Sequence, residues 1–202
     1  MYNLFRQKMT PFLIFSKSDV KKEFPNFDAK NLVNWQKKGY IQKIRSNFYR
    51  FLEVNVDERF LYKTANKIYN PSYISLETAL WHYNVIPESV FTITSVTTLK
   101  TNQFHTPFAV FNYRHLKPNL YFGYQLVDYQ NTKYRFADLE KTVLDYLYLN
   151  PSISTCTSFE HLRWNQEVLR KINLELLNQY LTLFNSKSLN QRVDYFLKFI
   201  YA

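Results

Sequence analysis

Residues 15–51 read FSKSDVKKEFPNFDAKNLVNWQKKGYIQKIRSNFYRF, and this stretch decides how the N-terminal part of the chain folds. Ser16 or Ser18 can begin a helix, because a serine hydroxyl accepts a hydrogen bond from a free amide at a helix start. This helix continues to about Phe24, and Pro25 ends it. The sequence therefore predicts one short helix ahead of Pro25.

A second helix is predicted from Asp28 to Lys38. Asp is a residue type that opens helices, and Gly39 ends this one. At about 100° per residue, Leu32 and Trp35 share one face, which would anchor the helix to the rest of the protein. The opposite face is polar and basic, and Asn and Lys side chains can reach base edges and phosphates in a major groove. For this segment alone, an ordinary amphipathic surface helix is the alternative.

A hairpin is predicted next. The β-prone segments 40–44 and 48–51 are separated by a short polar turn, Arg45-Ser46-Asn47. Helix, helix and hairpin is the order of a winged helix-turn-helix, whose second helix enters the major groove and whose hairpin, the wing, contacts the phosphate backbone. The residues expected to contact DNA are Lys30, Asn31, Asn34, Lys37, Lys38, Lys43, Arg45, Ser46, Asn47 and Arg50.

Positive charge is concentrated in the same segment. The chain has 202 residues and a net charge of +10, and residues 1–52 hold 11 Lys and Arg against 3 Asp and Glu, a net +8. A basic segment attached to a nearly neutral body indicates a module that binds a polyanion. A solubilising surface is the alternative, and the helices, the hairpin and the local charge together favour double-stranded DNA.

The whole chain is predicted to be α+β and to have three parts. Residues 1–55 form the winged helix-turn-helix domain. Residues 56–70 form a linking helix, and Pro71 marks the next boundary. Residues 71–202 form an α+β domain that interacts with a partner and ends in helices.

Turn signals and periodicity place the elements of the third part. Strands are predicted at residues 91–96, 108–113, 121–129 and 133–136. Helices are predicted after the caps Ser75, Asn173 and Ser188, from Glu160 to Lys171, and from a start at Ala137 or Asp138. Gly123 is expected to mark a bulge or a close approach of the backbone to another group.

The composition indicates the cellular compartment in which the protein is expected. Cys156 is the only cysteine, so the chain forms no internal disulfide and no cysteine-ligated metal site, which fits a reducing cytoplasm. The N-terminal segment lacks the basic and apolar regions of a signal peptide. No stretch approaches the roughly 20 apolar residues that span a bilayer. We expect a cytoplasmic protein without a membrane partner.

Motifs of catalysis are absent from the sequence. It contains no glycine-rich phosphate loop, HExxH, GxSxG or paired-cysteine ligand set. His82 near Glu77 could act as a base in hydrolysis, but a histidine hydrogen-bonded in a helix–sheet interface is the favoured interpretation.

Three acidic residues near the start of a predicted helix could bind a metal or stabilise the helix. Asp138, Glu140 and Asp145 could bind Mg²⁺. Asp138 and Glu140 lie in the first turn of a helix, where the helix dipole favours carboxylates, and we interpret them as caps. We therefore expect no enzymatic activity, cofactor or metal, with a nuclease or hydrolase as the remaining enzymatic alternative.

Four segments in order resemble the AbiEi family of abortive-infection antitoxins from type IV toxin–antitoxin systems. They begin with FSKSDV and NLVNWQKKGYIQKIRSNFYRF, and continue with YISLETALWHYNVIPESVFTITSVT, RHLKPNLYFGYQL and YRFADLEKTVLDYLYLNP. The family pattern appears as Ser75, Ala79, Leu80 and His82 in one helix, and as Ala137, Glu140, Lys141 and Asp145 in a later one.

The resemblance implies a viral-defence transcriptional regulator without enzymatic activity. Such a protein represses its own operon by binding inverted repeats in the operator, and it opposes a co-encoded nucleotidyltransferase-like toxin. The family's wing usually has a glycine where this chain has Asn47, which is expected to replace it because Asn tolerates left-handed backbone angles. A winged-helix module that docks protein or RNA without operator specificity is the alternative.

Overall fold

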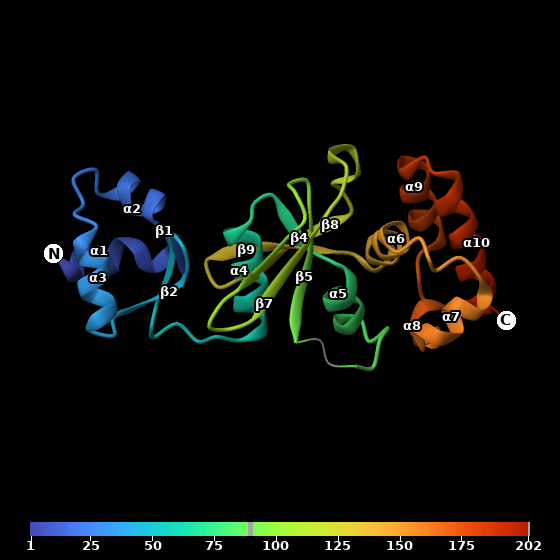
Figure 1. Cartoon of the computed structure of the whole chain (residues 1–202), viewed down its shortest axis with the longest axis horizontal. Coiled ribbons are helices and arrows are strands. Elements are labelled where there is room, and N and C mark those ends of the chain that lie inside the picture. Colours follow the sequence, from blue (N-terminus) through green and yellow to red (C-terminus); the bar gives the residue numbers. More distant parts are fainter. Residues whose placement is uncertain (89–90, 202) are drawn as a thin grey trace.

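The computed structural model describes residues 1–88 and 91–201, and it has the α+β fold class that the sequence predicts. The molecule is elongated, with the two termini toward opposite ends (Figure 1). A small unit of helices and three strands forms the N-terminal end. A six-stranded sheet lies in the middle, and helices form the C-terminal end.

The N-terminal unit (residues 1–54) contains the two helices and the hairpin that the sequence predicts. Its elements are α1 (Tyr2–Met9), the 3₁₀ helix η1 (Thr10–Phe12), β1 (Ile14–Ser16), α2 (Lys17–Glu23), α3 (Lys30–Lys37), β2 (Ile41–Arg45) and β3 (Phe48–Phe51). The three strands form an antiparallel sheet in the order β1-β3-β2.

Local sequence signals set the ends of these helices. At the start of α2, the Ser16 hydroxyl accepts a hydrogen bond from the Asp19 amide at 3.0 Å, and the Asp19 carboxylate accepts one from the Ser16 amide at 2.8 Å. Gly39 follows α3 in the left-handed conformation, with φ of +71°. Asn47 is not among the residues with positive φ, so the expectation that it adopts a left-handed backbone is wrong.

Aromatic side chains form the core of the N-terminal unit. The ring centroid of Phe5 lies 4.4 Å from that of Trp35 and 5.5 Å from that of Phe15. Leu32 and Trp35 are both buried, at 2% and 6% exposure. They fasten α3 to the unit through the face that the sequence predicts.

The three-stranded sheet also has a second buried face. Because side chains alternate along a strand, Phe15 packs among the N-terminal aromatics while Ile14 points the other way. Ile14 and Ile44 share a core with Phe60 and Phe111 of the middle part. The N-terminal unit therefore packs on the middle part through its sheet, and its helices lie on the far side (Figure 1).

The middle part is a mixed six-stranded sheet in the order β6-β7-β5-β4-β9-β8. Its strands are β4 (Ser72–Ile74), β5 (Thr92–Thr97), β6 (Asn102–His105), β7 (Val110–His115), β8 (Tyr124–Tyr129) and β9 (Thr132–Ala137). The predicted strands are present, and β8 pairs with β9 as expected. The sequence did not predict β6 or the parallel pairs β5–β7 and β4–β9.

Helices cover both faces of this sheet. The segment predicted as a linking helix is α4 (Glu58–Ile68), and it packs on the face toward the N-terminal unit through Phe60, Tyr62 and Ala65. On the opposite face lie α5 (Leu76–His82) and α6 (Leu139–Leu149), with the short 3₁₀ helix η2 (Pro118–Leu120) nearby (Figure 1). The sheet is thus the middle layer between the N-terminal unit and the C-terminal helices.

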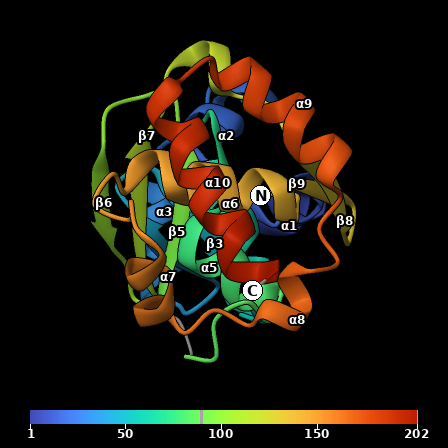
Figure 2. The same ribbon diagram turned by 90° about the vertical axis from the view of Figure 1, so that its right-hand side faces the viewer.

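The C-terminal helices are α7 (Cys156–Leu162), α8 (Gln166–Leu169), α9 (Leu174–Phe184) and α10 (Lys187–Tyr201). Figure 2 views this end and shows α10 in front of α6. Val193, Phe196 and Ile200 of α10 share the core that holds Val143 and Leu147 of α6. No helix within residues 1–88 and 91–201 combines the length and apolarity needed to cross a membrane.

Two predicted helix boundaries in this region are wrong. The helix expected from Glu160 to Lys171 is instead α7 and α8, because Arg163 adopts a left-handed conformation with φ of +54° and interrupts it. The last helix begins before Ser188, and the Ser186 hydroxyl accepts a hydrogen bond from the Leu189 amide at 3.3 Å.

Candidate nucleic-acid interface

The outer face of α3 carries the side chains that the sequence assigned to base and phosphate contacts. Asn34, Lys37 and Lys38 are exposed, and Lys30 is exposed at the first position of the helix. Their backbone is held in place because Leu32 and Trp35 are buried on the inner face. A rigid helix therefore presents amide and ammonium groups to solvent, the two groups that read base edges and bind phosphates.

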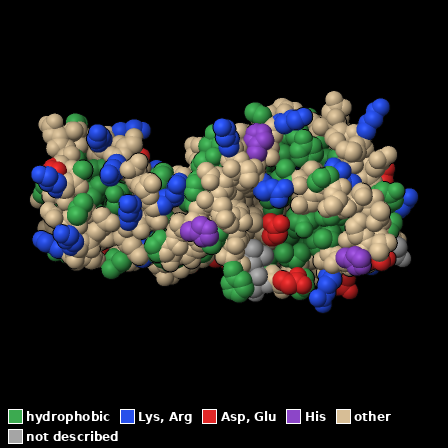
Figure 3. Space-filling model, in the orientation of Figure 1, with side chains coloured by type: hydrophobic (Ala, Val, Ile, Leu, Met, Phe, Trp, Pro, Cys, Tyr) green, Lys and Arg blue, Asp and Glu red, His purple; other side chains and the backbone are tan. Residues whose placement is uncertain are grey.

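The lysines of α3 are not neutralised by neighbouring acids. Among the ion pairs of the described residues, those that involve the N-terminal unit join Arg6 to Glu53 and Lys67 to Asp19, and neither includes a lysine of α3. In Figure 3, Lys and Arg side chains are spread over the N-terminal unit with few acidic groups between them. The charge of α3 is therefore available to a polyanion.

The Asn31 side chain forms a hydrogen bond at the start of α3. Its side-chain amide donates to the Asp28 carbonyl at 3.1 Å, and the Asp28 carboxylate accepts from the Lys30 amide at 2.8 Å. The helix predicted to start at Asp28 begins two residues later, at Lys30, with Ala29 as its N-cap. Asn31 was expected to contact DNA, but it is half-buried and its amide already has a partner.

The tip of the hairpin lies beside the start of α2. Ser46 and Asn47 are exposed, and the Asn47 carbonyl accepts a hydrogen bond from the Lys17 amide at 3.0 Å. Lys17, Lys21 and Asn47 line one hollow of about 450 Å³. Lys17 and Lys21 are not among the DNA-binding residues predicted from the sequence, although their spacing of four on a helix places them on one face.

The three basic residues of the hairpin have different surroundings. Lys43 is exposed on β2. Arg45 is half-buried, and its guanidinium carbon lies 3.5 Å from the ring centroid of Phe104 on β6. Arg45 therefore faces the six-stranded sheet, whereas Lys43 remains accessible.

Arg50 lies in the interior, contrary to its predicted place on the surface of the wing. It is only 7% exposed. Its guanidinium donates to the Gln42 side chain at 2.8 Å and to the carbonyls of Phe51, Leu52 and Val54 at 3.1, 3.1 and 2.5 Å. These bonds fasten β3 to β2 and to the segment that follows β3, so Arg50 stabilises the hairpin.

Replacing Arg50 by methionine is expected to lower stability without changing the affinity of the folded protein for DNA. The substitution leaves buried carbonyls unpaired, which costs about 1–3 kcal/mol in the free energy of unfolding. Urea denaturation measures the loss, and duplex binding at a temperature where the variant is folded measures the affinity. A fully stable variant that no longer binds DNA would instead place Arg50 in the interface.

The groups considered for catalysis do not form a site. His82 is exposed, and its ring lies 4.6 Å from the ring of Phe136, while Glu77 is half-buried on the same helix. Five residues of helix separate them by about 140° around the axis, so they face different directions. The described part of the chain contains no group of three or more His, Cys, Asp or Glu that could hold a metal ion.

The acids at the start of α6 have structural partners. Asp138 caps the helix by accepting from the Lys141 amide at 2.8 Å, as predicted. Glu140 accepts from the Asn173 amide at 2.8 Å. Asp145 is completely buried and ion-paired with Lys141, which is also completely buried.

A polar network surrounds this buried ion pair. The hydroxyls of Tyr73 and Ser75 donate to the Asp145 carboxylate at 2.7 and 3.0 Å. The Ser75 hydroxyl therefore does not form the side-chain cap of α5 that the sequence predicted. Burial lowers the pKa of Lys141 and raises that of Asp145, and their mutual attraction opposes both shifts. Gly123 approaches closely as predicted, since a Cβ there would lie 2.8 Å from the Lys141 side chain.

No protein-family model and no curated protein matches this chain.

Proposed function

We propose that the N-terminal unit is a winged helix-turn-helix and that the protein is a transcriptional regulator binding double-stranded DNA. The observation that carries this proposal is the outer face of α3, where exposed Asn and Lys side chains stand on a well-packed helix without acidic partners. In this arrangement α3 enters the major groove and the tip of the hairpin contacts the backbone.

The position of the N-terminal unit supports the same function. Its helices lie on the side away from the six-stranded sheet, so a duplex can approach α3 without meeting the rest of the chain (Figure 1). Lys17 and Lys21 of α2 lie beside the hairpin tip and add basic side chains to the wing. Contacts from two elements fix the register of a protein on DNA better than contacts from one.

The resemblance of its four segments to AbiEi antitoxins supports a further part of the proposal. The regulated operon is the protein's own, and the operator contains inverted repeats. The middle and C-terminal parts oppose a co-encoded nucleotidyltransferase-like toxin. No catalytic step is assigned to this chain.

A reporter experiment in cells tests both parts. The protein is expected to repress a reporter fused to its own promoter, and to restore growth when it is co-expressed with the adjacent nucleotidyltransferase-like reading frame. Equal reporter output with and without the protein would contradict the regulatory part. Growth arrest that persists on co-expression would contradict the antitoxin part.

A further inference from the structure

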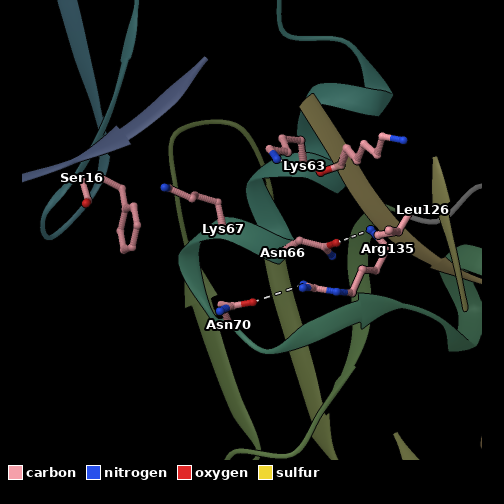
Figure 4. Close-up of a pocket in the computed structure, with 9 residues that line it drawn as sticks. Ser16, Lys63, Asn66, Lys67, Asn70, Leu126 and Arg135 are labelled. Atoms are coloured by element: carbon pink, nitrogen blue, oxygen red, sulfur yellow. Dashed lines mark hydrogen bonds between the residues drawn. The ribbon is translucent and has the colours of Figure 1, made fainter. Parts of the chain in front are cut away.

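A basic groove lies where the N-terminal unit meets the middle part. It has a volume of about 460 Å³, and its lining includes Lys63, Lys67, Lys133, Arg135, Asn66 and Phe48. Figure 4 shows that its side chains come from α4, from β9 and from the edge of the N-terminal sheet, with Lys67 directed toward Ser16 and Arg135 toward Asn70. The groove is separate from the outer face of α3.

The lining carries four cations and no carboxylate. Lys67 pairs with Asp19 of α2 at 2.8 Å, and Lys133 pairs with Asp128 at 3.3 Å. Lys63 and Arg135 take part in no ion pair of the described residues. The Lys63 ammonium donates to the Lys133 carbonyl at 2.7 Å, and the Arg135 guanidinium donates to the Asn70 side chain at 3.2 Å.

Burial and neighbouring cations both act on the Lys63 ammonium. Its pKa is lowered, first by burial and then by repulsion from Lys67 and Arg135. An anion between these groups reverses the repulsive contribution. Lys63 and Arg135 therefore have no carboxylate partner among the described residues, although Lys67 already pairs with Asp19, and the groove has the electrostatics of a partly neutralised anion site.

Asn66 supplies an independent indication of a ligand. It lines the groove and is only 7% exposed. Its side-chain oxygen accepts from the Arg135 amide at 2.5 Å, which fixes the orientation of the side chain and directs its nitrogen elsewhere. That nitrogen is buried and has no acceptor. Buried donors rarely lack a partner, and Asn66 lines the groove, so a ligand seated against this side chain can supply the acceptor.

The remaining walls indicate the size and shape of the ligand. Phe48 is half-buried and lines the side formed by the N-terminal unit, and Leu126, 59% exposed, lines the side formed by β8. Apolar walls next to cations suit a molecule with a flat apolar part and an anionic part. The volume lies in the range of pockets for small molecules, about 300–1,000 Å³.

We propose that the basic groove binds a nucleoside monophosphate. Its phosphate lies between Lys63, Lys67 and Arg135, and its base packs against Phe48. Asn66 donates to an oxygen of the ligand. The phosphate competes with Asp19 for Lys67, so binding loosens the ion pair that joins α2 to α4.

Isothermal titration calorimetry with AMP, GMP, CMP and UMP tests the site, with the matching nucleosides as controls. At least one monophosphate is expected to bind about tenfold more tightly than its nucleoside, as charge-assisted hydrogen bonds to phosphate require. Replacing Lys63 and Arg135 together by glutamine is expected to weaken that binding about tenfold or more. The matched control replaces the exposed Lys171 and Lys187 by alanine and leaves binding unchanged.

A second variant gives a change in the opposite direction. Asp19→Asn keeps a side-chain oxygen that can accept from the Ser16 amide and removes the charge that competes for Lys67, so monophosphate affinity is expected to rise several-fold. Because the expected change is a gain in affinity, this variant tests the monophosphate site even if the variant with Lys63 and Arg135 replaced does not fold. Unchanged or weaker binding by Asp19→Asn overturns the proposal.

Two other outcomes also overturn it. One is the absence of heat with all four monophosphates at about millimolar concentration, which is well above the dissociation constant of an ordinary small-molecule site. The other is a loss of duplex affinity in the Lys63 and Arg135 variant while the wild-type protein binds no monophosphate. That result would assign the groove to the phosphate backbone of DNA.

Discussion

Replacing Lys37 and Lys38 of α3 by alanine is expected to weaken binding to the promoter duplex about tenfold or more at physiological salt. Both side chains are exposed at the C-terminal end of α3, and neither has an acidic partner among the described residues. Each ammonium that contacts a phosphate displaces a counterion from the DNA, which makes a large part of the binding free energy electrostatic. Stability should change little, because surface substitutions usually stay within about 0.5 kcal/mol.

Fluorescence anisotropy over a series of salt concentrations measures this effect. The slope of log affinity against log salt is expected to become shallower by roughly two, one for each phosphate contact removed. Lys171→Ala combined with Lys187→Ala removes the same charge from exposed positions in the C-terminal part and serves as the matched control. Equal weakening by both pairs would assign the effect to net charge, and unchanged binding would remove α3 from the interface.

Replacing Lys141 by methionine is expected to cost about 3–5 kcal/mol in the free energy of unfolding, the largest stability effect among the substitutions considered. The substitution keeps most of the side-chain volume but leaves the Asp145 carboxylate in the interior with only the hydroxyls of Tyr73 and Ser75. An uncompensated buried charge is far more costly than the absence of the whole pair.

Urea denaturation of three variants isolates this cost. Lys141→Met and Asp145→Leu each leave one charge unpaired, whereas the double variant leaves none. The loss in the double variant is expected to be smaller than the sum of the two single losses. Lys171→Met changes an exposed lysine and should have almost no effect. Single losses below about 1 kcal/mol would show that the ion pair contributes little.

Local signals were sufficient to predict most of the N-terminal unit. Ser16, Gly39 and the polar turn around Ser46 act on neighbouring residues only, and periodicity alone identified Leu32 and Trp35 as the buried side of α3. The exposed residues of α3 followed from the same periodicity. In contrast, the local sequence wrongly predicted Arg50 on the surface of the wing. Its burial depends on carbonyls of the following segment and on packing against the middle part.

The features that sequence reasoning missed depend on contacts between distant segments. Strand β5 pairs in parallel with β7, and the Tyr73 hydroxyl donates a hydrogen bond to Asp145. Both interactions join residues that are far apart in the sequence and share no local pattern. The basic groove is another case, since Phe48 comes from the hairpin while Lys63 and Arg135 come from α4 and β9. Arg163 interrupts a helix without any glycine or proline to mark the break.

The affinity of the full chain for its own promoter, compared with a scrambled duplex of equal length and composition, tests DNA recognition most directly. At about 0.15 M salt, binding to the promoter duplex is expected to be at least a thousandfold tighter, since specific sites usually exceed non-specific ones by roughly that factor or more. Equal affinity for the two duplexes would contradict operator recognition and would favour a module that docks protein or RNA.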